Sequence, residues 1–342
     1  MYGYTVGDAA HTLKRMSSST RRVGIAVLAL AVAIVLIGYG FYRRDVAAAH
    51  ARLIGASEVV TTPCGPIEYA SSGTGPPVLF VHGAGGGFDQ GLAFGAPLAA
   101  HGYRVIAPSR FGYLRTPLPA DASAAAQADA HACLLDELGL ERAAVAAGSA
   151  GAPSALQLAV RHPERVTALV LIVPAAFVPR PDGAAPLHTP SGTQRLFGTA
   201  LNSDFLFWAI RRAAPNVMIQ GLLGTPPELV ARAEESERAR VAGILDMILP
   251  VSDRRLGLLN DAEITTHLER YALERIAAPT LTISVADDLY GTYDAARYTA
   301  EQIPGARFVG FAEGGHVFVG HDAEVTNAIA NFLLLIATHP PP

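Results

Sequence analysis

Cysteine is scarce in this sequence, and its scarcity limits the chemistry that the chain can support. Only two cysteines, Cys64 and Cys133, occur among 342 residues. Two cysteines build no disulfide framework and no zinc site, so we expect neither a metal nor metal-dependent catalysis. Cys133 falls in a helical pattern and is expected to pack as a small buried hydrophobic residue. The alternative is a Cys64–Cys133 disulfide, which requires an oxidising compartment.

Charge is also sparse. Charged residues make up 16% of the chain, and the formal net charge is −4 at pH 7. Nucleic-acid binding depends on a concentrated positive field, which this composition does not supply. We therefore expect no nucleic-acid partner.

The longest uncharged run, Val23–Tyr42 (VGIAVLALAVAIVLIGYGFY), is strongly apolar. About twenty such residues match the hydrocarbon thickness of a bilayer, so we interpret the run as a transmembrane helix that follows a tail at 1–22. The chain would then be a single-pass membrane protein. Basic residues flank the run with a narrow excess before it, as Lys14, Arg15, Arg21 and Arg22 against Arg43, Arg44 and Arg52. This excess favours a cytoplasmic N-terminus and an extracytoplasmic catalytic domain.

Two other interpretations of this run are weaker. A cleaved signal peptide usually has a shorter apolar region, and Arg43, Arg44 and Asp45 stand where small residues should precede the cleavage site. A buried core helix of a soluble protein rarely lacks a polar face over five turns.

The rest of the chain alternates between strand-like and helix-like patterns. A short tether is expected at Ala47–Ala56 and a hairpin at Val59–Ala70. Six further runs have strand length and β-branched content: Val78–Val81, Tyr103–Ala107, Ala143–Ala147, Val166–Val173, Thr280–Val285 and Arg307–Phe311. Helical patterns separate them at Phe88–Ala100, Ala122–Leu138, Ala150–Arg161, Tyr293–Gln302 and Ala323–Ile336. This alternation predicts an α/β fold with a mostly parallel sheet that helices cover on both faces.

The alternation stops between Pro179 and Arg275, where Pro-rich turns separate apolar helical patterns. We therefore expect a helical cap at 180–275, inserted into an α/β core formed by 55–179 and 276–338. Phe207 and Trp208 are predicted to line an apolar substrate pocket in this cap. The alternative is that such apolar residues form the cap's own interior.

Ala147-Gly148-Ser149-Ala150-Gly151 joins a predicted strand directly to a predicted helix. A nucleophilic serine works in this context because small neighbours permit a tight turn that exposes its hydroxyl. The amide of Ala150 would then face the developing oxyanion. The alternative is a turn rich in Gly and Ala without a catalytic role.

The glycine-rich loop His82–Gly87 follows the first long apolar strand. Such a loop can approach the serine and supply a second amide to the oxyanion, for which Ala84 is the candidate. A phosphate-binding loop is the competing interpretation. It is disfavoured because no GK[ST] ends the loop and no dinucleotide-binding fingerprint continues it.

A serine nucleophile needs a base, and the base needs a buried acid to hold its tautomer. His316 follows two glycines after the last predicted strand, and Asp288 follows the preceding strand at the same sheet edge. Asp287 is the alternative acid, although Asp288 lies farther into the loop. His321 is the alternative base, but it lies at the start of the final helix without adjacent glycines.

Taken together, His82-Gly83, the AGSAG turn, the Asp288 loop and Gly315-His316 resemble the α/β-hydrolase superfamily over about 280 residues. Arg161–Val166 (RHPERV) is similar to the family's usual link out of the helix that follows the serine. The resemblance implies a doubly wound, mostly parallel sheet with a helical cap after the sixth strand, and acyl-enzyme chemistry without a cofactor. The sequence departs from the family at Ala147, where Gly is usual, and at Ser109, where relatives often have an acidic residue.

These residues favour a serine hydrolase that acts on small, uncharged, apolar carboxylic esters or related acyl compounds. Epoxide hydrolases and haloalkane dehalogenases are disfavoured because they need a carboxylate where Ser149 stands. Carbon–carbon bond hydrolysis, thioester hydrolysis and cofactor-free haloperoxidase activity use the same residues and remain alternatives. A non-catalytic binding protein on the same scaffold is the alternative of a different class.

Overall fold

The computed structural model describes residues 18–179 and 201–338, and the chain divides into two compact units, Met1–Ala48 and Ala49–Pro342. Most of the predicted N-terminal tail therefore lies outside the described residues. Helix α2 runs from Ser18 to Leu53, and by length and composition it can cross a membrane.

Helix α2 is longer than the predicted span, and the tether expected at Ala47–Ala56 is wrong, because the helix continues to Leu53. The alanines in this stretch are the strongest helix formers. After α2, the first residue with left-handed backbone is Gly55, whose φ is 70°. Glycine in this conformation is a common helix terminator.

The second unit is built on an eight-stranded sheet with the order β1-β2-β4-β3-β5-β6-β7-β8. Its strands are β1 (Glu58–Thr62), β2 (Gly65–Ser72), β3 (Pro77–Val81), β4 (Arg104–Pro108), β5 (Ala143–Gly148), β6 (Val166–Ile172), β7 (Thr280–Val285) and β8 (Arg307–Phe311). Strand β2 pairs antiparallel with β1 and β4, and every other neighbouring pair is parallel. The prediction of a mostly parallel sheet that begins with a hairpin is confirmed.

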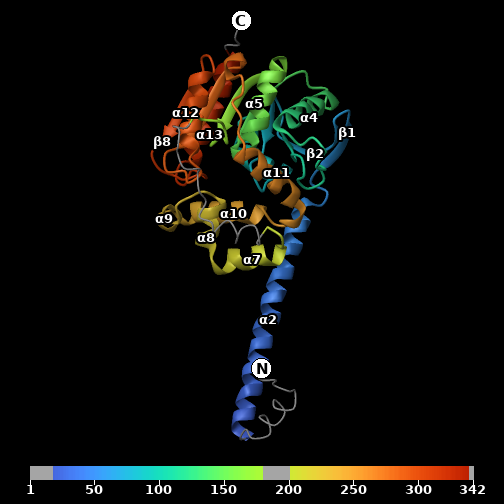
Figure 1. The fold of residues 1–342 in the computed structure, drawn as a ribbon, viewed down its shortest axis with the longest axis vertical. Coiled ribbons are helices and arrows are strands. Elements are labelled where there is room, and N and C mark those ends of the chain that lie inside the picture. The colour runs from blue at the N-terminus through green and yellow to red at the C-terminus, as the bar shows by residue number, and fades with distance from the viewer. Residues whose placement is uncertain (1–17, 180–200, 339–342) are drawn as a thin grey trace, which may run out of the picture. The chain divides into compact units, whose positions relative to one another are not determined.

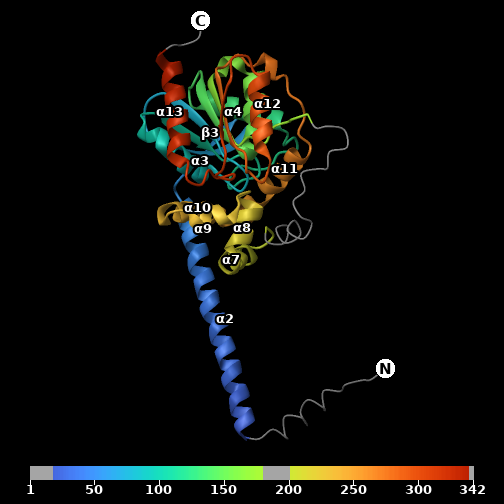
Figure 2. The same ribbon diagram turned by 90° about the vertical axis from the view of Figure 1, so that its left-hand side faces the viewer.

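Helices cover both faces of this sheet. They are α3 (Phe88–Ala100), α4 (Ala124–Glu137), α5 (Ala152–Arg161), α12 (Thr292–Gln302) and α13 (Asp322–Thr338). Residues of α3 and α13 share one apolar core with Phe80, whereas residues of α4, α5 and α12 share the other with Leu79. Figure 2 shows α12 and α13 on opposite sides of the sheet. Adjacent strand residues point to opposite faces, which explains why these strands are apolar throughout.

Between β6 and β7, the described residues form five α-helices. They are α7 (Asp204–Ala213), α8 (Pro215–Leu222), α9 (Pro227–Arg232), α10 (Glu235–Met247) and α11 (Arg255–Thr266). They fall in the segment predicted as a cap, of which 180–200 lies outside the described residues. Figure 1 shows α7 to α10 gathered beyond one end of the strands. Phe207, Met218 and Val241, on three of these helices, are fully buried, so the cap has an apolar interior of its own.

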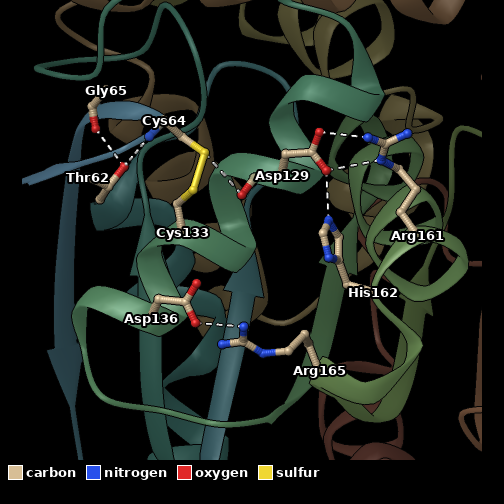
Figure 3. Close-up of a disulfide and its surroundings, with 9 residues drawn as sticks. All are labelled: Thr62, Cys64, Gly65, Asp129, Cys133, Asp136, Arg161, His162 and Arg165. Atoms are coloured by element: carbon tan, nitrogen blue, oxygen red, sulfur yellow. Dashed lines mark hydrogen bonds and ion pairs between the residues drawn. A yellow bond between two sulfur atoms is a disulfide. The ribbon is translucent and has the colours of Figure 1, made fainter.

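The two cysteines form a disulfide, which corrects the expectation of a free, buried Cys133 (Figure 3). Cys64 lies in the turn between β1 and β2, and Cys133 lies on α4. Their Cα atoms are 6.2 Å apart, within the range that a disulfide spans. The bond therefore fastens the edge hairpin to a helix that covers the sheet.

We expect the disulfide to contribute about 2–4 kcal/mol to the free energy of unfolding, because it closes a long loop in the unfolded chain. The two cysteines are 69 residues apart in the sequence. Urea unfolding of a Cys64→Ser/Cys133→Ser double variant should show this loss, and wild-type protein with dithiothreitol should match the variant. Two free thiols in the unfolded, unreduced wild-type protein would contradict the pairing.

Two histidines are buried near the carboxyl ends of the central strands. Burial lowers the pKa of His82 well below its ordinary value, and the charge of Arg110 acts in the same direction. Burial likewise lowers the pKa of His131 to about 3. The ring of His82 is neutral, since its Nδ1 donates to Gly83 O at 2.7 Å and its Nε2 accepts from the Arg110 amide at 3.0 Å.

We expect stability to fall as the pH drops below about 6.5, the ordinary pKa of histidine. The unfolded chain then binds protons on both imidazoles, whereas the folded chain keeps them neutral. The free energy of unfolding is therefore unaffected by these histidines above this pH and falls below it. Its slope against pH approaches about 1.4 kcal/mol per pH unit for each histidine.

Urea unfolding between pH 8 and pH 5 measures this slope. In His131→Gln, unfolding should take up about one proton fewer, so the free energy of unfolding should depend less steeply on pH, whatever its value at pH 8. His267→Gln is the matched control because that side chain is 68% exposed. An unchanged slope in His131→Gln would contradict the assignment.

Candidate active site

Ser149 lies where β5 turns into α5 through a short 3-10 turn, Ser149–Gly151. Its φ is 47°, a strained value for a residue with a side chain. A Cβ on Gly151 would lie 2.6 Å from His82 O and 2.8 Å from Val81 O, so this position requires glycine. Ala147 is fully buried in β5. The position that tolerates no side chain is therefore Gly151, two residues after the serine. Ala147, two residues before the serine, fits as an alanine in the interior of β5.

The structure brings the predicted nucleophile, base and acid together. His316 Nε2 lies 3.0 Å from Ser149 Oγ, and His316 Nδ1 lies 2.8 Å from Asp288 Oδ2. The Asp288 side chain is 0% exposed and that of His316 is 11% exposed. With its proton on Nδ1, the imidazole donates to the carboxylate and accepts from the serine hydroxyl.

Further residues that the sequence analysis did not identify hold Asp288 in place. The Tyr290 amide donates to Asp288 Oδ1 at 2.9 Å, and the Thr292 hydroxyl donates to Asp288 Oδ2. Ser284 Oγ lies 2.9 Å from Thr292 Oγ1 and supports it from within β7. These partners leave the carboxylate oriented toward the imidazole and satisfied within a buried site.

The alternative acid and base lie elsewhere. Asp287 Oδ1 accepts a hydrogen bond from the Gly315 amide at 2.8 Å, so it holds the histidine loop without contacting the imidazole. His321 pairs with Glu324 at 2.6 Å, and its ring lies against Phe311.

The cap contacts both loops that carry the acid and the base. Gly224, between α8 and α9, accepts hydrogen bonds at its carbonyl from the Leu289 amide at 2.9 Å and from the His316 amide at 3.4 Å. Tyr290 places its ring edge-on to the imidazole, with 4.9 Å between ring centroids. A Cβ on Gly224 would lie 2.5 Å from the Tyr290 ring. Little space therefore separates the cap from the base.

The glycine-rich loop also reaches the serine. A Cβ on Gly83 would lie 3.3 Å from Ser149 Cβ. The predicted oxyanion donors Ala84 and Ala150 follow Gly83 and Ser149 directly in the sequence, and Ala84 is exposed whereas Ala150 is buried. The glycine-rich loop and the serine turn therefore lie against each other.

Ser109 stands where relatives often place an acidic residue, and the structure supplies the carboxylate from another strand. Ser109 Oγ accepts from the Phe88 amide at 3.1 Å and donates to Glu68 Oε2 at 2.8 Å. Glu68 is buried on β2 and pairs with Arg115 at 2.7 Å. A buried carboxylate therefore supports the start of α3 through the Ser109 hydroxyl.

The two predicted substrate-binding residues lie on α7. Phe207 is fully buried, and Trp208 is 9% exposed. The Trp208 ring stacks with Phe205 at 6.0 Å and lies 5.9 Å from the Arg212 guanidinium. This burial favours the alternative, in which these residues form the interior of the cap.

Comparison with known proteins agrees with this fold. Residues 76–218 match the family described as alpha/beta hydrolase fold. The "Putative carbamate hydrolase RutD" of Klebsiella pneumoniae (strain 342) is 32% identical over 258 residues, which cover 74% of this chain and 89% of that protein. The "Uncharacterized hydrolase YcgS" of Bacillus subtilis (strain 168) is 39% identical over 114 residues, which cover 33% of this chain and only 40% of that protein.

A solved structure extends the agreement to three dimensions. An alpha/beta hydrolase fold protein from Nakamurella multipartita superimposes with a TM-score of 0.62 and 29% identity, covering 81% of this chain and 98% of that one. The sheet order, the serine turn and the match to RutD over nearly its whole length lead to one conclusion. The chain belongs to the α/β-hydrolase superfamily, as the resemblance implied.

Proposed function

We propose that this protein is a serine hydrolase that cleaves carboxylic esters or related acyl compounds. The observation that carries the proposal is the continuous chain of hydrogen bonds from Ser149 Oγ through His316 to Asp288, at 3.0 and 2.8 Å. A buried carboxylate, an imidazole and a serine on strained backbone, hydrogen-bonded in this order, are the parts of nucleophilic acyl transfer.

In the proposed reaction, Ser149 Oγ attacks the carbonyl carbon while His316 Nε2 takes its proton. Asp288 stabilises the imidazolium, and the amides of Ala84 and Ala150 donate to the oxyanion. The imidazolium then protonates the leaving alkoxide, which departs and leaves an acyl-serine. Water enters, transfers a proton to His316 Nε2 and attacks the acyl carbon. As the second oxyanion collapses, the imidazolium returns its proton to Ser149 Oγ and the acid is released.

The surroundings of the serine support a small, uncharged, apolar substrate. Ile248, a buried cap residue, packs over the glycine-rich loop, since a Cβ on Gly85 would lie 3.3 Å from its side chain. The name of the relative RutD gives a carbamate as its substrate, which supports attack at a carbonyl carbon. Phe207 and Trp208 are proposed to shape the acyl pocket through the packing of the cap.

Removing the nucleophile tests the proposal. Ser149→Ala should abolish labelling by a fluorophosphonate and reduce hydrolysis of p-nitrophenyl acetate by several orders of magnitude. His316→Ala should behave in the same way. A folded Ser149→Ala variant with wild-type esterase activity would refute the serine-hydrolase mechanism, and a wild-type protein that resists labelling would favour a non-catalytic binding protein.

The two adjacent carboxylates provide a matched comparison within the same experiment. Asp288→Asn should lower kcat on the order of 10⁴-fold, as in other Ser–His–Asp sites, because the imidazole loses its tautomer and its counter-charge. Asp287→Asn should be mild, since an amide oxygen can still accept from the Gly315 amide. If Asp287→Asn were the severe variant, the acid would be reassigned.

We also propose that the apolar part of α2 anchors the protein in a membrane, with the hydrolase unit on the extracytoplasmic side. The basic residues before the run support this orientation. The Cys64–Cys133 disulfide supports it independently, because disulfides persist in oxidising compartments.

Deleting residues 1–42 should release an active, soluble protein, whereas the full chain should stay in the membrane fraction after a carbonate wash. The shortened chain should begin at Arg43 because Ala49 is buried and Arg52 donates to Leu249 O at 2.8 Å within the second unit. N-terminal sequencing of the mature protein provides the control. A mature N-terminus beyond Tyr42 would identify a cleaved signal peptide instead.

A further inference from the structure

A buried ion pair joins the cap to the loop that follows β4. The Arg110 guanidinium donates to both carboxylate oxygens of Asp261, on α11, at 2.6 and 2.7 Å. The Tyr113 hydroxyl donates to Asp261 Oδ2 at 2.5 Å. Arg110, Tyr113 and Asp261 are all buried, with exposed fractions of 4%, 0% and 3%.

The same groups hold the glycine-rich loop on both sides of Ala84. Arg110 donates to His82 O at 2.9 Å and to Gly83 O at 3.1 Å. The Tyr113 hydroxyl accepts from the Gly85 amide at 3.2 Å. The carbonyl before Ala84 and the amide after it are therefore both fixed by side chains that Asp261 binds.

The electrostatics of this network depend on Asp261. Burial alone acts to lower the pKa of Arg110, but the charge and hydrogen bonds of Asp261 outweigh it and raise that pKa. Burial raises the pKa of Tyr113, and the charge of Asp261 raises it further. Without the carboxylate, a buried guanidinium would lose its counter-charge, and the tyrosine hydroxyl would lose its acceptor.

Tight packing limits how these groups can adjust. The Gly257 amide, on α11, donates to Gly112 O at 2.9 Å. A Cβ on Gly257 would lie 2.1 Å from the Tyr113 ring. Arg254, just before α11, is fully buried and donates to Gly86 O at 2.5 Å. The cap therefore binds the glycine-rich loop at a second point.

We propose that Asp261 is a positioning residue for the oxyanion site: through Arg110 and Tyr113 it fixes the amide of Ala84 in the direction of the oxyanion at Ser149. The inference rests on the proposed hydrolase function and extends it. The cap then contributes to stabilising the transition state, in addition to covering the substrate. An interaction that strengthens as charge develops on the carbonyl oxygen should affect kcat and leave KM nearly unchanged.

Tyr113→Phe is the central test because it removes only the hydroxyl that joins Asp261 to the Gly85 amide. We expect kcat for p-nitrophenyl acetate to fall about tenfold, which is less than complete loss of an oxyanion donor. KM should change less than twofold. The affinity of a phenylboronic acid, which forms a tetrahedral adduct with the serine, should fall by the same factor as kcat.

Controls separate positioning from general damage. Tyr298→Phe, on α12, removes a hydroxyl elsewhere, and Glu263→Gln alters an exposed carboxylate on α11 whose side chain is 76% exposed. Both should retain wild-type kcat. The pH profile of kcat/KM for Tyr113→Phe should match the wild type, because the His316–Asp288 pair is untouched, and Tm should be recorded for every variant.

Asp261→Asn should lower kcat more than Tyr113→Phe does, again with nearly unchanged KM and an equal loss of boronic acid affinity. In the Tyr113→Phe/Asp261→Asn double variant the losses should be less than additive, because both residues act through one loop. All measurements use the full chain in detergent, and if Asp261→Asn does not fold, Tyr113→Phe decides the question.

The outcomes distinguish the inference from the function on which it rests. Wild-type protein that neither labels with fluorophosphonate nor hydrolyses the ester would refute the hydrolase function. An active wild type with unchanged kcat and boronic acid affinity in Tyr113→Phe would overturn the positioning role alone. A rise in KM with unchanged kcat, or strictly additive losses in the double variant, would overturn it as well.

Discussion

The arrangement of the candidate site depends on one close backbone approach at the carboxyl ends of β3 and β5. Gly151 lies against the carbonyls of Val81 and His82, where no side chain fits. This contact holds the turn in which Ser149 adopts a left-handed backbone, and it also brings the glycine-rich loop beside the serine. This contact fixes the direction of the serine. Asp288 and His316 meet it because loops at the same edge of a parallel sheet lie close together.

Much of this arrangement could be predicted from the sequence because its signals are local. Apolar runs of strand length alternating with helical patterns predict the parallel sheet, and the carboxyl-edge rule then groups Ser149, Asp288 and His316. The adjacent pair of acids was also separable, since Asp288 lies one position farther into its loop. The structure gives Asp287 a different partner, the Gly315 amide.

What could not be predicted depends on pairs that are distant in the sequence. Arg110 and Asp261 are separated by 151 positions, and neither has neighbours that reveal a partner. Ser109 carries no carboxylate of its own, and only the fold shows that its hydroxyl donates to Glu68. The helical pattern around Cys133 carries no information about the hairpin turn to which the disulfide joins α4.

The carbonyl of Gly224 has a consequence for how this protein relates to its family. Because it accepts from the loops of both the acid and the base, the cap is not an interchangeable module attached to a finished catalytic core. A cap transplanted from a relative would have to supply an acceptor at this point, or the two loops would lose a shared support. Divergence in substrate preference should therefore concentrate in cap residues that leave the Gly224 turn unchanged.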